Sequence, residues 1–215
     1  MSAMPYPVTV SVEPLHANRN RLTTAFRLIL AIPHIILVGG VGFGIVSDQG
    51  HGGFRSAGES GLLGAVAAIL AFVSWFTIVV GGKHVAGIRQ FTNFYLRWRV
   101  RGLAYLMLLE DKYPPFGDEP YPASISVVDP AGPRDRVSVA LRLILAIPQF
   151  IVVIVLMFCW WVTSIVAWLL ILLTGAYPQG LYDFGVGCLR WLLRVEAYML
   201  LMVDEYPPFS LSANP

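Results

Sequence analysis

The sequence predicts an all-α integral membrane protein built from two tandem copies of one unit. The heptapeptide Arg27–Pro33 recurs identically at Arg142–Pro148, and Tyr113–Phe116 recurs at Tyr206–Phe209. The chain of 215 residues is 56% hydrophobic and only 13% charged, with a mean hydropathy of +0.66. Because a water-soluble domain carries about 25% charged residues, we expect a bilayer to form part of the solvent of this protein.

The copies divide the chain into a first repeat, residues 1–117, and a second repeat, residues 118–215. Corresponding residues are 115 positions apart as far as the first half of the apolar region, and 93 apart beyond it. The first copy therefore holds 22 extra residues, which fall in the glycine-rich, polar segment 39–60. Since unpaired backbone groups in hydrocarbon cost several kcal/mol each, this segment is expected to be a long extracytoplasmic loop.

Each copy is expected to form a helical hairpin, which gives four transmembrane helices. The predicted spans are Leu28–Val46, Gly61–Gly81, Leu143–Phe158 and Trp161–Thr174.

The second hairpin requires a tight turn near residues 158–164. A straight helix from Leu143 to Ala176 would be ~50 Å long, whereas the hydrocarbon core is ~30 Å thick. The alternative is an interfacial segment over residues 134–147 followed by one tilted span over residues 149–176.

A short strand is predicted before each hairpin and an amphipathic helix after it. Apolar residues alternate in Val8–Val12 and in Ala123–Val127, which indicates half-buried strands that can pair across an axis between the copies. Residues 87–109 and 180–203 share the pattern Arg-Trp-x-x-Arg-x-x-Ala-Tyr. Because Trp, Tyr and Arg favour the headgroup layer, both segments are expected to be interfacial helices.

The distribution of Lys and Arg predicts the orientation. Fourteen of the fifteen lie outside residues 39–60. By the positive-inside rule, the two strands, both chain ends and the linker between the copies face the cytoplasm. The copies would then run in the same direction around a pseudo-twofold axis along the membrane normal.

The recurring arginines are the candidate lipid-binding residues, together with the tryptophans beside them. Guanidinium groups bind phosphate in a bidentate manner. The candidates are Arg27, Arg97, Trp98, Arg101, Arg142, Arg190, Trp191 and Arg194. The same arginines can instead set the topology and form internal ion pairs, and the pattern favours both roles equally.

Two of the acidic candidates recur in both copies. The candidates are Asp183, Glu196, Glu110, Asp111 and Asp204. The two that recur are Asp111 and Asp204, which follow the amphipathic helices. We expect them to cap the helix ends or to pair with nearby arginines.

No motif predicts catalysis, a metal or a cofactor. The four histidines and two cysteines lack metal-ligand spacing. Gln149 and Tyr177 stand where the first copy has His34 and His84, so the repeated unit needs no histidine pair. A net charge of +2 is too small to suggest a nucleic-acid binder.

Three motifs of the second copy carry a resemblance to a known family. They are Thr-Gly-x-Tyr-Pro-x-Gly-Leu-x-x-Phe at Thr174–Phe184, Arg-Trp-x-x-Arg-Val-x-Ala-Tyr at Arg190–Tyr198, and Asp-x-Tyr-Pro-Pro-Phe at Asp204–Phe209. With the Arg-x-x-Leu-x-x-Pro helix starts, they resemble the bacterial membrane family catalogued as domain of unknown function 4389. The first copy departs from the pattern at Gly81–His84. The resemblance implies a membrane protein of duplicated hairpins, and it implies no activity. We expect a multi-pass protein of the bacterial cytoplasmic (inner) membrane.

Repeated architecture without repeated catalytic groups favours a non-catalytic accessory or scaffold subunit of a bacterial membrane complex. Its expected partners are membrane lipids and other membrane-protein subunits. One alternative is a lipid or small-solute transport protein that uses the groove between the hairpins. Another is a lipid-headgroup enzyme with Asp111 or Asp204 as its base.

Overall fold

The chain folds into two copies of a strand-and-helix unit. The computed structural model describes residues 6–40, 57–117, 119–130, 132 and 134–213. The first copy contributes β1 (Val8–Val12), α1 (Arg21–Ala25), α2 (Arg27–Val38), α3 (Ala57–Gly81) and α4 (Ala86–Leu106). The second contributes β2 (Ala123–Val127), α5 (Arg136–Ala140), α6 (Arg142–Leu145), α7 (Ile147–Thr174) and α8 (Gln179–Met199).

The two strands pair with each other, as their alternating patterns predict. They are antiparallel, and Val10 lies opposite Ile125. These two residues occupy the same position in the two repeats. A pseudo-twofold axis therefore passes through this pair at right angles to the sheet.

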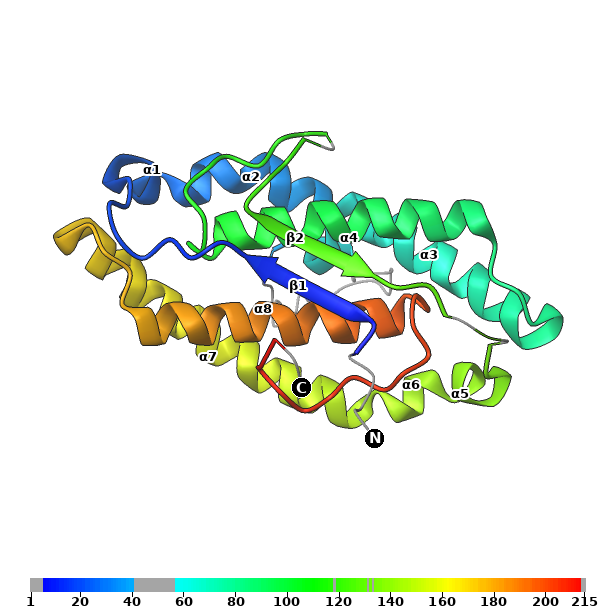
Figure 1. Cartoon of the computed structure of the whole chain (residues 1–215). Helices are drawn as coiled ribbons and strands as arrows, with labels where there is room; N and C mark the ends of the chain where they lie inside the picture. Colours follow the sequence, from blue (N-terminus) through cyan, green and yellow to red (C-terminus); the bar gives the residue numbers. More distant parts are fainter. Residues whose placement is uncertain (1–5, 41–56, 118, 131, 133, 214–215) are drawn as a thin grey trace, which may run out of the picture.

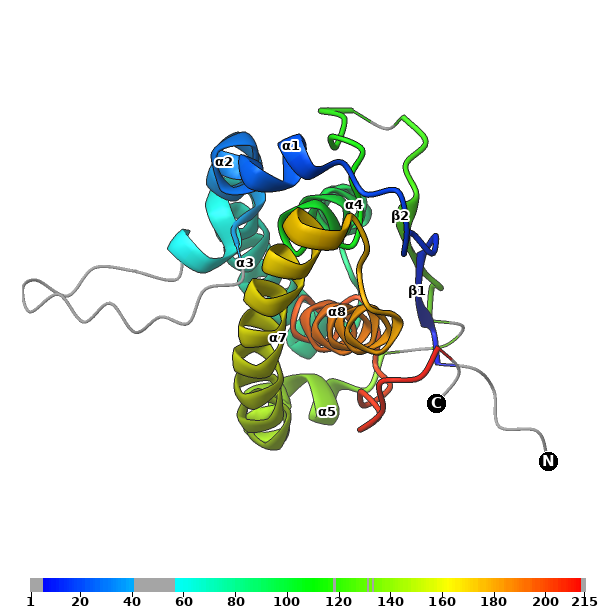
Figure 2. The same ribbon diagram turned by 90° about the vertical axis from the view of Figure 1, so that its left-hand side faces the viewer.

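The elements form three layers along this axis. Figure 1 looks onto the sheet, with α4 and α8 lying lengthwise behind it. Figure 2 shows the sheet at one side, α4 and α8 in the middle, and α2, α3 and α7 on the far side. We call α4 and α8 the arm helices, and α2, α3 and α7 the apolar layer.

The arm helices occupy the buried middle of the protein. Twelve of the 21 residues of α8 are buried, including Cys188, Leu189 and Leu193. Both helices form where the sequence predicts helices, and the protein itself covers much of their surface. The sheet covers one face of the pair and the apolar layer covers the other, so the amphipathic pattern reflects packing within the protein.

The predicted tight turn near residues 158–164 is wrong. The helix α7 runs without a break through these residues. After Pro148, which lies in its first turn, α7 contains neither proline nor glycine, so nothing in the sequence ends the helix. The alternative with one long apolar helix agrees with the structure.

The first copy interrupts the same helix with its insertion. Gly39 and Gly61 both correspond to Ile154 of α7, because the offset between the copies changes here from 115 to 93. A Cβ on Gly61 would lie 2.4 Å from the backbone nitrogen of Gly39. The chain therefore returns to the point that it left, and the part of α3 that follows its kink at Gly61 starts beside the end of α2. Most of the predicted loop 39–60 lies outside the described residues.

Reciprocal contacts interlock the two copies. Trp75 of α3 donates to the carbonyl of Val139 in α5 at 3.0 Å, and Trp168 of α7 donates to the carbonyl of Thr24 in α1 at 2.9 Å. Trp75 and Trp168 are equivalent positions of the two repeats, and so are Thr24 and Val139. Each long apolar helix thus packs on the short first helix of the other copy.

Two helical segments in the described part of the chain are long and apolar enough to cross a membrane, namely Gly61–Gly81 and Ile147–Thr174. Four separate spans do not form there, since α2 ends at Val38 after 12 residues. Large apolar side chains of the apolar layer are strongly exposed, for example Leu28 (71%), Phe72 (71%) and Leu173 (75%).

Substituting Gly61 by alanine is expected to destabilise the protein strongly. The residue has φ +68°, and an added Cβ would meet backbone atoms of Leu37 and Gly39 at 2.4 to 2.6 Å, so both the conformation and the space exclude a side chain. Gly87→Ala is the control, because nothing lies within 4 Å of its Cβ and alanine favours a helix. Thermal unfolding in detergent should show a clear loss for Gly61→Ala only. Equal melting temperatures would contradict the close junction of α2 and α3.

Candidate functional site

The first copy contains a buried cluster in which two arginines share one carboxylate. Arg19 Nη2 and Arg27 Nη2 lie 2.7 and 2.6 Å from Oδ1 of Asp111. The guanidinium of Arg27 also lies 4.1 Å above the ring of Tyr105, a cation–π geometry. The cluster joins the segment before α1 and the start of α2 to the end of α4.

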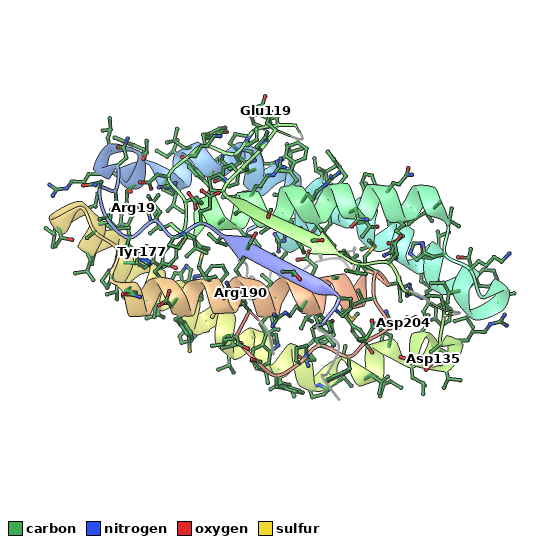
Figure 3. The ribbon with its side chains drawn as sticks, in the orientation of Figure 1. Arg19, Glu119, Asp135, Tyr177, Arg190 and Asp204 are labelled. Atoms are coloured by element: carbon green, nitrogen blue, oxygen red, sulfur yellow. The ribbon has the colours of Figure 1, made fainter. Side chains whose placement is uncertain are left out.

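The second copy repeats this cluster. Arg134 Nη2 and Arg142 Nη2 lie 2.9 and 3.0 Å from Oδ1 of Asp204. The guanidinium of Arg142 lies 4.2 Å above the ring of Tyr198. Figure 3 shows Arg19 and Asp204 toward opposite ends of the molecule. We refer to the two sets as the Asp111 cluster and the Asp204 cluster.

A left-handed turn after each arm helix builds the clusters. Leu108 and Leu201 have φ values of 65° and 61°, and their carbonyls accept from Arg19 and Arg134. Arg142 similarly donates to the carbonyls of Tyr198 and Val203. The arginines thereby bind carbonyl groups in and just after the last turn of the arm helices, where a cation is favourable.

In the Asp111 cluster, burial disfavours the charged forms of the side chains, and the opposite charges of neighbouring groups favour them. Burial raises the pKa of Asp111, but hydrogen bonds from Arg19 and Asn20 and the two arginine charges outweigh it, so the net shift is downward. Burial lowers the pKa of Arg27, against the opposing effects of Tyr105 and Asp111. Asp111 is therefore a charged anchor, with its oxygens occupied by guanidinium and backbone donors.

Four of the predicted lipid-binding arginines are buried, namely Arg27, Arg101, Arg142 and Arg194. Arg101 donates to the carbonyl of Gly117, and Arg194 donates to the carbonyls of Ser210, Ser212 and Ala213. The protein itself covers most of the surface of these four side chains.

The two predicted tryptophans also take part in a repeated network. Trp98 donates to Nδ1 of His34 at 3.1 Å, and Trp191 donates to Oε1 of Gln149 at 2.8 Å. His34 and Gln149 are equivalent positions. Trp191 is buried and Trp98 is half-buried, so both rings fix α4 and α8 to the apolar layer.

Arg97 and Arg190 remain at the surface. Arg97 is exposed, and Arg190 is half-buried, with Nε donating to the carbonyl of Val10 in β1. Figure 3 shows Arg190 beside the sheet. The structure thus does not bring the eight candidates together into one lipid-facing surface.

Glu110 is a buried acid next to Asp111. It does not recur in the second copy, so the comparison of the repeats did not place it in the site. It is 3% exposed, and its Oε1 has no hydrogen-bond partner among the described residues. The equivalent residue in the second copy is Val203, which is also buried. Burial raises the pKa of Glu110 from 4.5 to about 7. The one available signal was an acid at a position that is apolar in the other repeat.

Neither cluster presents a free base. Asp111 and Asp204 each accept from two arginines, and the described ranges contain no group of three or more His, Cys, Asp or Glu side chains that could hold a metal. The geometry therefore favours a structural role for the two aspartates.

Glu110 should make stability fall as the pH rises. Its pKa is about 7 in the folded protein, against 4.5 for an ordinary glutamate, so the unfolded chain releases this proton first. Between pH ~4.5 and ~7 this linkage removes up to about 3 kcal/mol of unfolding free energy. Glu110→Val should abolish that slope and raise the melting temperature at pH 8.

The matched control for this experiment is Glu119→Gln at an exposed carboxylate. It should follow the wild-type dependence of melting temperature on pH. A Glu110→Val protein with an unchanged pH profile would show that Glu110 is ionised or solvated in the folded state.

Comparison with known proteins places the chain in a family. The family model described as Domain of unknown function (DUF4389) matches residues 59–117 and again residues 136–210. No curated protein and no solved structure matches the chain. The two matches fall in the two repeats and together cover more than half of the sequence. The chain therefore belongs to the DUF4389 family and contains its domain in two tandem regions.

Proposed function

We propose that this protein is a non-catalytic accessory or scaffold subunit of a bacterial membrane complex, lying with its apolar layer in one leaflet of the cytoplasmic membrane. The observation that carries this proposal is the layered arrangement of the fold. Many exposed apolar side chains belong to α2, α3 and α7, and Figure 2 shows these helices on the side away from the sheet. A large contiguous apolar surface is typical of a membrane or protein interface.

An in-plane position suits this arrangement better than four spans. The long helices lie crosswise to the pseudo-twofold axis (Figure 1), and the Asp111 and Asp204 clusters lie toward opposite ends of the molecule (Figure 3). If α3 and α7 crossed the bilayer, one cationic cluster would lie on each side, against the positive-inside rule. In the membrane plane, both clusters lie on one side.

The length of α7 supports the same position. A helix of 28 residues is ~42 Å long, so a tilt of about 45° would be needed to keep all of it within a ~30 Å hydrocarbon core. Helices that span membranes rarely tilt beyond ~40°. A helix that lies along the surface has no such limit.

The sheet then faces the cytoplasm, with both ends of the described chain on that side. Arg194 of α8 lies over the ring of Tyr6 and donates to the carbonyl of Ala213. Headgroup contact falls to Arg21 and Arg136, which are exposed and whose side chains lie beside Gly175 and Gly82, at the ends of α7 and α3. A cation at a helix C-terminus is also favourable for the helix dipole.

The repeated contacts support a scaffold more than a transporter or an enzyme. The sharing of each aspartate by two arginines leaves neither Asp111 nor Asp204 free to act as a base in headgroup chemistry. The cavity between α2 and α7 is lined by apolar residues except Arg27 and Ser164, so it offers no polar route for a solute.

Spin labels along α7 test the in-plane position. Cysteines at Ile151, Val162 and Leu173, in a background with Cys159 and Cys188 replaced by alanine, place labels at exposed positions near the start, middle and end of the helix. In liposomes, the ratio of oxygen to nickel-chelate accessibility should report similar shallow depths at all three. A label at Thr9 on the sheet is the aqueous control.

A spanning helix would instead give the greatest depth at Val162 and shallow depths at both ends, which would contradict the in-plane position. The accessory role fails separately if the protein, extracted from its native membrane in mild detergent, migrates on a native gel at the mass of the chain alone.

A further inference from the structure

We propose that the cavity between α2, α7 and the end of α4 binds one long-chain fatty acid as its carboxylate. Its volume of ≈ 570 Å³ lies in the range of ~300–1,000 Å³ that small-molecule sites occupy. The proposal rests on the in-plane position above for the source of the ligand, which is the acyl layer of the leaflet.

The walls of the cavity suit an acyl chain. They include Ile35, Leu106 and Trp168, which offer apolar surface for burial. Leu28, Trp161 and Ile165 also line the cavity, and these three side chains are exposed on the apolar layer. The cavity therefore borders the surface that we place in the hydrocarbon, and a lipid chain can enter without crossing water.

Ser164 is the first polar feature that points to a ligand. It lines the cavity and is 8% exposed, and its hydroxyl forms no hydrogen bond within the part of the chain that the structure describes. It is close enough to Tyr177 to oppose the burial-driven rise in that residue's pKa, yet the two hydroxyls do not reach hydrogen-bond geometry. The equivalent residue Ala71 is also buried. The fold therefore does not require a hydroxyl here, and an unpaired one is unfavourable without a partner.

Arg27 determines the charge of the ligand. It is the charged residue of the cavity wall, and its Nε has no hydrogen-bond partner among the described residues. Arg19 and Arg27 share the single carboxylate of Asp111, so this cluster carries one excess positive charge while Glu110 is protonated. A carboxylate complements that charge and forms strong hydrogen bonds with guanidinium, whereas an ester or a cationic amphiphile does not.

The test uses a dibrominated stearate, whose heavy atoms quench the fluorescence of nearby tryptophans. Trp161 and Trp168 line the cavity, so binding to the detergent-solubilised full chain should give saturable quenching. Ser164→Ala, which matches Ala71 of the first copy, should weaken the apparent affinity about five- to tenfold through loss of one hydrogen bond. Gly40→Leu should abolish saturable quenching, because its Cβ meets only Leu106 and Ile35, at 3.6 and 3.8 Å, and its side chain fills the cavity.

Gly87→Leu is the matched control, since the space around its Cβ is open, and melting temperatures verify that each variant is folded. Equal quenching in wild type, Ser164→Ala and Gly40→Leu would overturn the site. Equal affinity for the dibrominated methyl ester would overturn the role of Arg27. Brominated phosphatidylglycerol that replaces the fatty acid and depends on Gly40 would show a phospholipid chain as the occupant and also overturn the proposal. Because these measurements need no bilayer, they are independent of the spin-label result.

Discussion

The structure depends on one interaction that occurs twice: a half-buried carboxylate shared by two arginines whose side chains are buried. Asp111 and Asp204 each lie just beyond an arm helix and bind two guanidinium groups from one segment of the same copy. We call this the entry segment, residues 19–27 in the first copy and 134–142 in the second. A buried charge is stable only when it is paired and hydrogen-bonded, so the entry segment and the arm helix must come together. Arg27 and Arg142 are the first residues of α2 and α6, so the joint holds the start of each of these helices against the end of an arm helix.

The sequence predicted much of the fold because the two copies could be aligned with each other. Alternating apolar residues in β1 and β2 predicted the strands, and the equivalence of Val10 and Ile125 agrees with their pairing. The predicted helical hairpin of the second copy was wrong, because the prediction assumed that the helix lies along the membrane normal and so cannot exceed the thickness of the membrane. No glycine or proline interrupts α7 after Pro148. This absence of helix breakers was a better guide to the length of the helix than the thickness of the membrane.

The candidate site could be predicted in its parts but not in its arrangement. Recurrence identified Asp111, Asp204 and their arginines, yet the headgroup interpretation depended on which way the arm helices face. An amphipathic pattern is the same whether its polar side meets lipid headgroups or a buried network, so sequence periodicity alone could not separate the two. Glu110 was an acidic candidate that recurrence did not select, and Ser164 was not a candidate, because each occurs in one copy only.

The most direct measurement of the shared-carboxylate joint is the unfolding free energy of Asp111→Asn and Asp204→Asn in detergent, with the exposed Asp183→Asn as control. Removing the carboxylate leaves two buried guanidinium groups without their counter-charge, so each variant should lose about 3 kcal/mol, and the two losses should be similar because the clusters are equivalent. If both variants unfold within about 0.5 kcal/mol of the wild type, as surface substitutions usually do, the two clusters do not hold the fold together.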